Sequence, residues 1–357
     1  MSGRKQHYLP RFLQHPFAFK ENGTRFYVYA HHRAHGSYPA NAMNLGQELD
    51  FYSGPDDTSL DDAITVTEKS LAITVHRLNG GEKLSQAEIA QLVSALSIRT
   101  KAMRQALIGM MPAFLEAAHA HILDKKNSQK RLYDSLQKPA TRKKAIDECI
   151  CEKWPDLNRE QRAQMRFHLL PKWKSFVENN KESLVAEMHD FATRIFDLML
   201  DEAAPIADKA FINALTRGPD TPVRTERFAE EMQFDIWDVD GAGEFVLGDC
   251  GPVAVFTDGV ARLALGTMDD DVEMEFVFLP VSPTKCIVGR RSQGNHGLSV
   301  DDLNRISAGL SHEFVVSRKM EGAPVAGLAS LIGSMTPIAS KEAIFQALND
   351  DGGEMVA

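Results

Sequence analysis

Apolar residues recur with two different periods along this chain. From about residue 59 to residue 214 they recur every three or four positions, which predicts helices because about 3.6 residues make one helical turn. From residue 234 onwards short segments alternate between apolar and polar residues, which is typical of strands. Residues 26–29, Phe-Tyr-Val-Tyr, add an early β-prone segment. The pattern predicts an α+β protein with an N-terminal arm and hairpin, a large helical region and a C-terminal antiparallel sheet.

Two stretches of the helical region carry further signals. Ser85, followed three residues later by Glu88, predicts a helix start with a capping box. Arg99 continues the apolar face of that helix, so its guanidinium either reaches solvent or meets a buried anion. A second stripe between residues 183 and 200 predicts a core-facing surface. Its members are Leu184, Met188, Phe191, Ile195 and Leu198.

Proline and glycine between residues 217 and 224 mark the strongest boundary in the chain. Beyond it, the Asp-Gly pairs at 240–241 and 258–259 predict hairpin turns, so the following strands are expected to form an antiparallel meander. We therefore divide the chain into four regions: an arm and β segment at 1–54, a helical region with a basic block at 55–216, an antiparallel β region with one helix at 217–325, and a C-terminal tail at 326–357.

The charge is unevenly distributed. The chain has a formal net charge of −9, yet residues 125–174 hold 14 Lys or Arg against 6 Asp or Glu. Cations interleaved with aromatic residues favour RNA or another single-stranded nucleic acid as a partner. A solvated helical face whose aromatic residues point inward is the alternative. The cations that we expect to contact nucleic acid are Lys126, Lys130, Arg131, Arg142, Lys143 and Lys144.

The remaining composition is that of an ordinary soluble protein. No apolar run approaches the length of about 20 residues needed to span a bilayer, and residues 1–25 lack a signal-peptide core. The four cysteines are too few for a disulfide framework in a chain of 357 residues, so we expect reduced thiols. These observations predict a cytoplasmic protein that does not contact membranes.

The N-terminus carries an unusual amount of apolar bulk around a proline, in the segment His7-Tyr8-Leu9-Pro10-Arg11-Phe12. A free terminus rarely does so unless it is docked, so we expect an arm tied into the fold. This segment, together with Phe26–Tyr29 and Leu279–Pro283, resembles a bacterial domain-of-unknown-function family with a His-Tyr-Val-Pro-Gln/Arg-Phe signature and a later Asp-x-Pro-Val element. The resemblance spans most of residues 5–317. It implies an architecture and a residue set rather than a reaction.

One departure from the family pattern concerns the loop around Asp249. The family commonly has Ser/Thr-Asp-Asn-Pro-Val, whereas this chain has Gly-Asp-Cys-Gly-Pro-Val at residues 248–253, with one more residue before the proline. The geometry of this loop is therefore expected to differ from that of the family.

Four residues, His7, Glu68, Arg99 and Asp249, are predicted to converge. An imidazole titrates near neutrality, carboxylates orient it or hold a divalent ion, and an arginine binds an anionic oxygen. Glu68 and Asp249 would supply oxygen ligands to Mg²⁺ or Mn²⁺. These groups suit phosphodiester cleavage. The alternative is a buried ion-pair cluster that locks the arm to the fold.

Two functional hypotheses follow. The first is a hydrolase of the nuclease type acting on a phosphodiester or nucleic acid, for which a role in bacterial defence would be suitable. The second is a non-catalytic binding or sensor module whose polar cluster is structural. An open pocket that reaches the four side chains would favour the enzyme, and a sealed cluster would favour the module.

Overall fold

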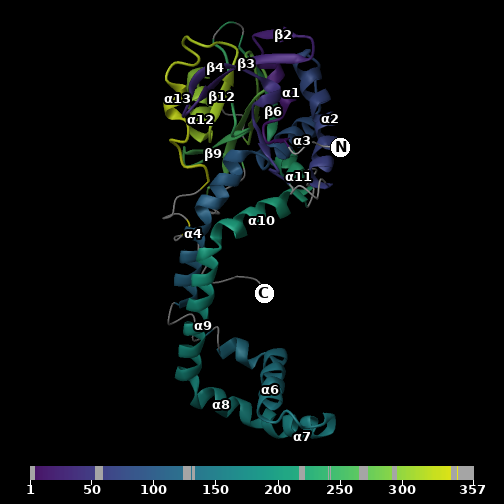
Figure 1. Cartoon of the computed structure of the whole chain (residues 1–357), viewed down its shortest axis with the longest axis vertical. Helices are drawn as coiled ribbons and strands as arrows, with labels where there is room; N and C mark the ends of the chain where they lie inside the picture. Colours follow the sequence, from purple (N-terminus) through teal and green to yellow (C-terminus); the bar gives the residue numbers. More distant parts are fainter. Residues whose placement is uncertain are drawn as a thin grey trace. The chain divides into compact units, whose positions relative to one another are not determined.

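The computed structural model describes residues 5–52, 59–123, 130, 133–216, 222–239, 241, 243–264, 272–291, 296–338 and 344. The chain divides into two compact units. The first consists of Met1–Met111 and Ala204–Ala343, and the second consists of Pro112–Ala203 and Ile344–Ala357. The predicted regions 1–54 and 217–325 thus lie in the same unit. The two units are described separately below, with the element labels of Figure 1.

The first unit contains antiparallel sheets, and the predicted α+β class is confirmed. One five-stranded sheet is the expected C-terminal antiparallel sheet, in the order β6, β11, β10, β8 and β9. This order differs from that of the predicted meander, because β6 pairs with β11 and β8 pairs with β10. The strands of this sheet are β6 (Gln233–Asp238), β11 (Lys285–Arg290), β10 (Met274–Pro280), β8 (Val253–Phe256) and β9 (Ala261–Leu263). Their central residues alternate little in burial, because both faces of β10 and β11 are covered: residues 276–280 and 286–289 are buried.

A second sheet joins the two ends of the sequence. β3 pairs with β2 and β4, its neighbours in the sequence, and with β12 near the C-terminus. β12 also pairs with β7. The strands are β2 (Lys20–Asn22), β3 (Arg25–His32), β4 (Gly36–Asn41), β12 (Phe314–Ser317) and β7 (Leu247–Gly248). The predicted N-terminal β segment is therefore not a separate hairpin. It is the centre of a sheet completed by distant strands.

Helices cover these sheets and carry the arm. Ser85 forms the expected capping box with Glu88 at the start of α3. The helices of this unit are α1 (Arg11–Gln14), α2 (Ser59–Asn79), α3 (Gln86–Ser97), α11 (Pro222–Glu231), α12 (Val300–Leu310) and α13 (Leu328–Leu331), with the 3₁₀ turns η1 (His15–Phe17) and η2 (Ala42–Asn44). The unit also holds residues 101–111 of α4 (Lys101–Leu123) and most of α10 (Ala203–Thr216).

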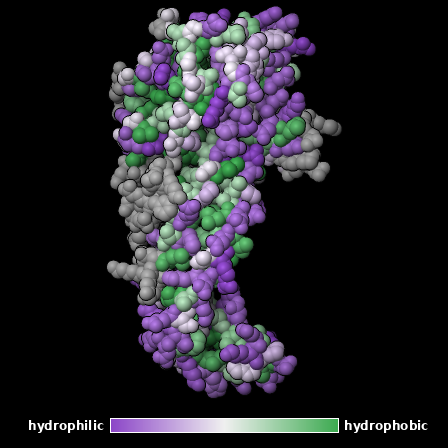
Figure 2. All heavy atoms as spheres, turned by 60° about the vertical axis from the view of Figure 1, so that its left-hand side comes forward, coloured by the Kyte–Doolittle hydropathy of each residue, from purple (hydrophilic) through white to green (hydrophobic). Residues whose placement is uncertain are grey.

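The described residues of the second unit are helical apart from short connections such as residues 154–158. Its elements are α6 (Pro139–Lys153), α7 (Arg159–Leu169), η3 (Leu170–Lys172), α8 (Trp173–Asn179) and α9 (Lys181–Asp201). The predicted core stripe on α9 is wrong. Phe191, Ile195 and Leu198 are 61%, 38% and 63% exposed, whereas Val185 and Phe196 are buried. Figure 2 shows apolar residues at the surface of the helical part of the molecule, among hydrophilic ones.

Helix α4 corrects the expectation that no segment is long and apolar enough to span a bilayer. Its 23 residues meet that criterion by length and composition. A single helix of this kind is weak evidence, because core helices of soluble proteins meet the same criterion. The helix also continues through Pro112, where the sequence favoured a break or a kink.

Candidate functional site

The N-terminal arm is docked, as predicted. Residues Lys5–His7 form β1, which pairs with β5 (Gln47–Leu49) so that His7 lies opposite Gln47. The following Leu9 is fully buried, and its backbone N–H donates to the carbonyl of Gly46 at 3.2 Å. The side chain of buried Gln14 donates to the carbonyl of Leu9 at 2.9 Å. Burial of apolar side chains and these bonds together fix the position of His7.

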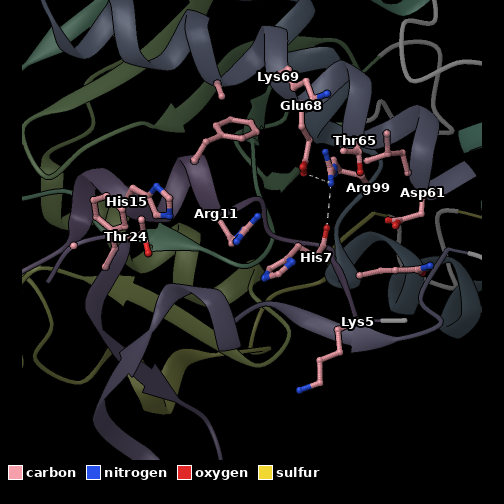
Figure 3. A pocket seen from close by; sticks show the side chains of 16 residues that line it. Lys5, His7, Arg11, His15, Thr24, Asp61, Thr65, Glu68, Lys69 and Arg99 are labelled. Carbon is pink, nitrogen blue, oxygen red and sulfur yellow. Dashed lines mark hydrogen bonds and ion pairs between the residues drawn. The ribbon is translucent and has the colours of Figure 1, made fainter. Parts of the chain in front are cut away.

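Arg99 joins three elements at this position. Its side chain is 5% exposed, and its Nη2 donates to Glu68 Oε1 on α2 at 2.7 Å and to the backbone carbonyl of His7 at 3.1 Å. Figure 3 shows both bonds as dashed lines. The hydroxyl of Tyr52 lies 3.1 Å from the carbonyls of both His7 and Arg99, and it can donate to either. Arg99 therefore meets an anion, which was one of its two predicted environments.

The imidazole of His7 has a defined tautomer. Its Nε2 lies 3.1 Å from the carbonyl oxygen of Met43. Because a carbonyl can only accept, Nε2 must carry a proton, and Nδ1 then holds the lone pair of the neutral ring. Burial lowers the pKa of His7 below the ordinary value of 6.5, against the opposing effect of the Met43 carbonyl. The ring is therefore mostly neutral at pH 7 and its Nδ1 is free to take up a proton.

A cavity of about 860 Å³ opens beside these residues, within the size range of small-molecule sites. His7, Glu68 and Arg99 all line it. Figure 3 shows the pocket with side chains from β1, α1, η1, the turn before β3, α2 and the segment after α3. Its ionisable lining residues are Lys5, His7, Arg11, His15, Asp61, Glu68, Lys69 and Arg99. Because Glu68 is already paired with Arg99, the remaining lining carries an excess of positive charge at neutral pH.

Five of these residues were not singled out as site residues from the sequence: Lys5, Arg11, His15, Asp61 and Lys69. Arg11 and His15 are four residues apart on α1 and η1, so both side chains lie on one side of a helical turn. Arg11 was visible only as part of the family signature. The i, i+4 spacing of a cation and an imidazole in a docked arm was the signal that could have revealed the pair.

His15 lies in a different environment from His7. Its ring stacks on that of Phe26, with centroids 3.9 Å apart and an interplanar angle of 15°. Burial lowers the pKa of His15 to about 4, and the nearby charge of Arg11 acts in the same direction. His15 is thus uncharged at pH 7. It contributes a flat ring and hydrogen-bonding nitrogens to the pocket, but no positive charge.

Asp249 lies elsewhere, which corrects the prediction that all four residues converge. It does not line the pocket and is completely buried. Its Oδ1 accepts from the backbone N–H of His312 at 2.7 Å, and its Oδ2 accepts from those of Glu313 and Phe314 at 2.8 and 3.3 Å. Since the backbone occupies both oxygens, Asp249 holds the turn before β12. It is not positioned to share a metal ion with Glu68.

The same turn also contacts the N-terminal arm through Glu313 and Tyr8. The carboxylate of Glu313 accepts from the hydroxyl of Tyr8 at 2.9 Å and from Nζ of Lys101 at 3.0 Å. Tyr8 directly follows His7 in the chain, so Asp249 contributes to the site by fixing Glu313. In the described ranges, no group of three or more His, Cys, Asp or Glu side chains is placed to hold a metal ion.

Burial raises the pKa of Asp249 to about 7, against the three N–H donors that favour the charged form. Between about pH 4 and pH 7 the folded protein therefore keeps a proton that the unfolded chain releases. The stability that this bound proton contributes to the folded protein is complete at low pH and is lost as the pH rises towards 7. We expect the free energy of unfolding of wild type, minus that of Asp249→Asn, to fall over this range in urea titrations. A difference that rises with pH would show that the N–H donors dominate.

The cations predicted to contact nucleic acid belong to the second unit. Lys126 and Arg131 lie outside the described residues. Lys130, Lys143 and Lys144 are exposed and Arg142 is half-buried. Nζ of Lys144 lies 3.9 Å from Oε1 of Glu148, and both side chains are exposed. Such a weak surface pair leaves the ammonium available to another anion. Of the interleaved aromatic residues, Trp173 donates its indole N–H to the carbonyl of Leu136, while Phe167 is 76% exposed.

Comparison with known proteins identifies a family. A family model described as "Protein of unknown function (DUF4238)" matches residues 5–321. This range contains the arm, both sheets and every residue of the pocket. No curated protein and no solved structure matches the chain.

Proposed function

Because the chain belongs to this family of proteins of unknown function, no activity follows from membership, and we propose from the site that it is a hydrolase of the nuclease type. The pocket would bind a phosphodiester, with His7 as the acid–base group. The observation that carries the proposal is the composition of the cavity: a neutral imidazole with a fixed tautomer lies among cations. Developing negative charge on a phosphate needs such cations, and its attacking group needs a base.

Each part of the pocket has a role in this proposal. Lys5, Arg11 and Lys69 form no ion pair with the described residues, so their charges are available to a phosphate. Nδ1 of His7 takes the proton from the attacking water or hydroxyl group. The carbonyl of Met43 stabilises the imidazolium that results, because it already accepts from Nε2. Glu68 and Arg99 position the arm, and the Nε of Arg99 has no hydrogen-bond partner in the described part of the chain.

The basic block of the second unit would contact the backbone of a single-stranded nucleic acid. Lys143 and Lys144 support this part of the proposal because their side chains are exposed on α6. Each phosphate contact releases a counterion, so binding is expected to weaken with salt.

The salt dependence gives a quantitative prediction for the block. Replacing both Lys143 and Lys144 by alanine should reduce the slope of log affinity against log salt by roughly 1.4, or about 0.7 for each lysine that no longer pairs with a phosphate. Fluorescence anisotropy with a labelled single-stranded RNA measures it. The matched control replaces Lys20 and Lys181, which are also exposed but lie outside the block. Equal slopes for both double variants would contradict the assignment.

A cleavage assay tests the activity itself. Labelled single-stranded RNA and DNA are incubated with the purified chain in EDTA, Mg²⁺ or Mn²⁺, and products are separated by length. We expect cleavage of at least one substrate, with a rate that depends on the pocket cations. Arg11→Ala should slow it, whereas Arg77→Ala, which changes an arginine outside the pocket, should not. Absence of cleavage under all conditions contradicts the hydrolase.

The bonds of Arg99 favour a second candidate, a non-catalytic binding or sensor module. They link β1, α2 and the end of α3 through side chain and backbone, which is the arrangement of a structural cluster. The module binds the same class of anion but does not turn it over. Ligand binding without cleavage in the assay above would support this candidate.

A further inference from the structure

The pocket has two chemically different ends. Figure 3 shows His15 and Thr24 on one side of His7, and Lys5 and Asp61 on the other. The first end is aromatic, since His15 and Phe26 both line the cavity and their rings stack on each other. The lining is charged around His7 and at the other end, where Lys5 and Asp61 lie. A bare phosphate would use only the charged part of a cavity of about 860 Å³.

We propose that the aromatic end is a nucleobase subsite formed by His15 and Phe26, so that the ligand of the pocket is a nucleotide. This inference rests on the proposed function, because it names the substrate class of the same site. The two rings stack with a centroid distance of 3.9 Å and an interplanar angle of 15°. Because these two rings face each other, a base would stack on the outer face of one of them, and this outer face is the flat wall of the subsite.

The charge state of this wall suits a neutral base. His15 is shielded by burial and lies near Arg11, and both lower the pKa of its ring, which therefore carries no charge at neutral pH. A neutral ring does not compete for the phosphate. Its nitrogens, and the hydroxyl of Thr24 on the turn between β2 and β3, provide polar groups for the edge of a base. Stacking with few polar contacts favours binding of bases over strict discrimination among them.

Arg11 connects the two ends. Figure 3 shows the Arg11 side chain between His15 and His7, and its charge lowers the pKa of both rings. A nucleotide whose base stacks on the wall would place its phosphate between Arg11 and His7. Arg11 on α1 and His15 on η1, four residues apart, would thus contact the phosphate and the base of the same nucleotide.

The test compares three ligands by isothermal titration calorimetry: inorganic phosphate, ribose 5-phosphate and adenosine 5′-monophosphate. Only the last contains a base. We expect it to bind roughly tenfold more tightly than ribose 5-phosphate, the effect of one stacked base. His15→Ala should abolish this preference and leave the affinity for inorganic phosphate unchanged. Arg11→Ala should weaken all three ligands, because it removes a phosphate contact.

Two variants control for folding and for aromatic content. His15→Phe keeps a ring and should keep the preference for the nucleotide. Phe19→Leu removes one member of the Phe19–Tyr29 pair, which has centroids 4.1 Å apart and an angle of 15° but does not line the pocket. It should bind all three ligands as wild type does.

Three results overturn the subsite: equal affinities for ribose 5-phosphate and the nucleotide in wild type, loss of inorganic phosphate binding in His15→Ala, or no binding of any ligand. Failure of the hydrolase is a separate outcome. If the nucleotide binds through His15 but no nucleic acid is cleaved, the subsite stands and the catalytic proposal fails. If cleavage occurs without base-dependent binding, the reverse holds.

Discussion

Replacing Arg99 by methionine is expected to destabilise the first unit by about 3 kcal/mol. The substitution leaves Glu68 and the carbonyl of His7 without their shared donor, in a region where Arg99 itself is 4% exposed. Burial makes this destabilisation larger than that from removing a surface ion pair, although Glu68 retains 27% side-chain exposure, which moderates it. Methionine keeps most of the volume, so the change reports the missing hydrogen bonds more than a cavity.

Arg77→Met is the matched control. Arg77 also contacts carboxylates, those of Glu82 and Glu88, but its side chain is 34% exposed. Its replacement should reduce stability much less than Arg99→Met does, because solvent screens an exposed ion pair. Urea unfolding measures both variants, and Glu68→Gln alone and combined with Arg99→Met gives the coupling. Similar decreases in stability for Arg99→Met and Arg77→Met would show that the cluster does not hold the arm.

His7→Ala is expected to lower the cleavage rate by roughly 10²- to 10⁴-fold, the usual contribution of a general acid or base. The imidazole is hydrogen-bonded to the carbonyl of Met43 and is only partly buried, so its removal should change stability little. The bonds that lock the arm use the backbone carbonyl of His7, which alanine retains. Activity and stability therefore separate in this variant.

Gel-based cleavage rates and melting temperatures of the same preparations measure the two effects. Leu49→Ala, on the paired strand β5 and outside the pocket, serves as a control for disturbance of β1. A small and equal decrease in rate for both variants would indicate that His7 does not act in proton transfer. A large fall in melting temperature for His7→Ala alone would identify its side chain as structural.

The sequence predicted the features that depend on local order. The three-residue spacing of Ser85 and Glu88 predicts the start of a helix, and the structure confirms the capping box. Arg99 was conspicuous because a charged residue continued an apolar face, and its partner Glu68 lay on the apolar side of the preceding helix. The docked arm followed from the apolar bulk at the terminus.

Features set by distant segments were not predictable in this way. The orientation of Asp249 depends on the backbone of residues 312–314, about sixty residues later in the chain, which offers three N–H donors to its carboxylate. The stripe of α9 has the spacing of a core face, but periodicity does not reveal whether a partner covers it, and Phe191 is exposed. His15 escaped attention because its significance comes from stacking on Phe26, in a different element.

The proposed chemistry requires that the ring of His7 be neutral at physiological pH and face an anion site. The direct measurement is the NMR titration of its imidazole, assigned by comparison with His7→Ala, with and without inorganic phosphate. We expect a pKa below 6.5 in the free protein and a rise in that pKa on addition of phosphate. A pKa at or above 6.5 that phosphate does not change would contradict both requirements.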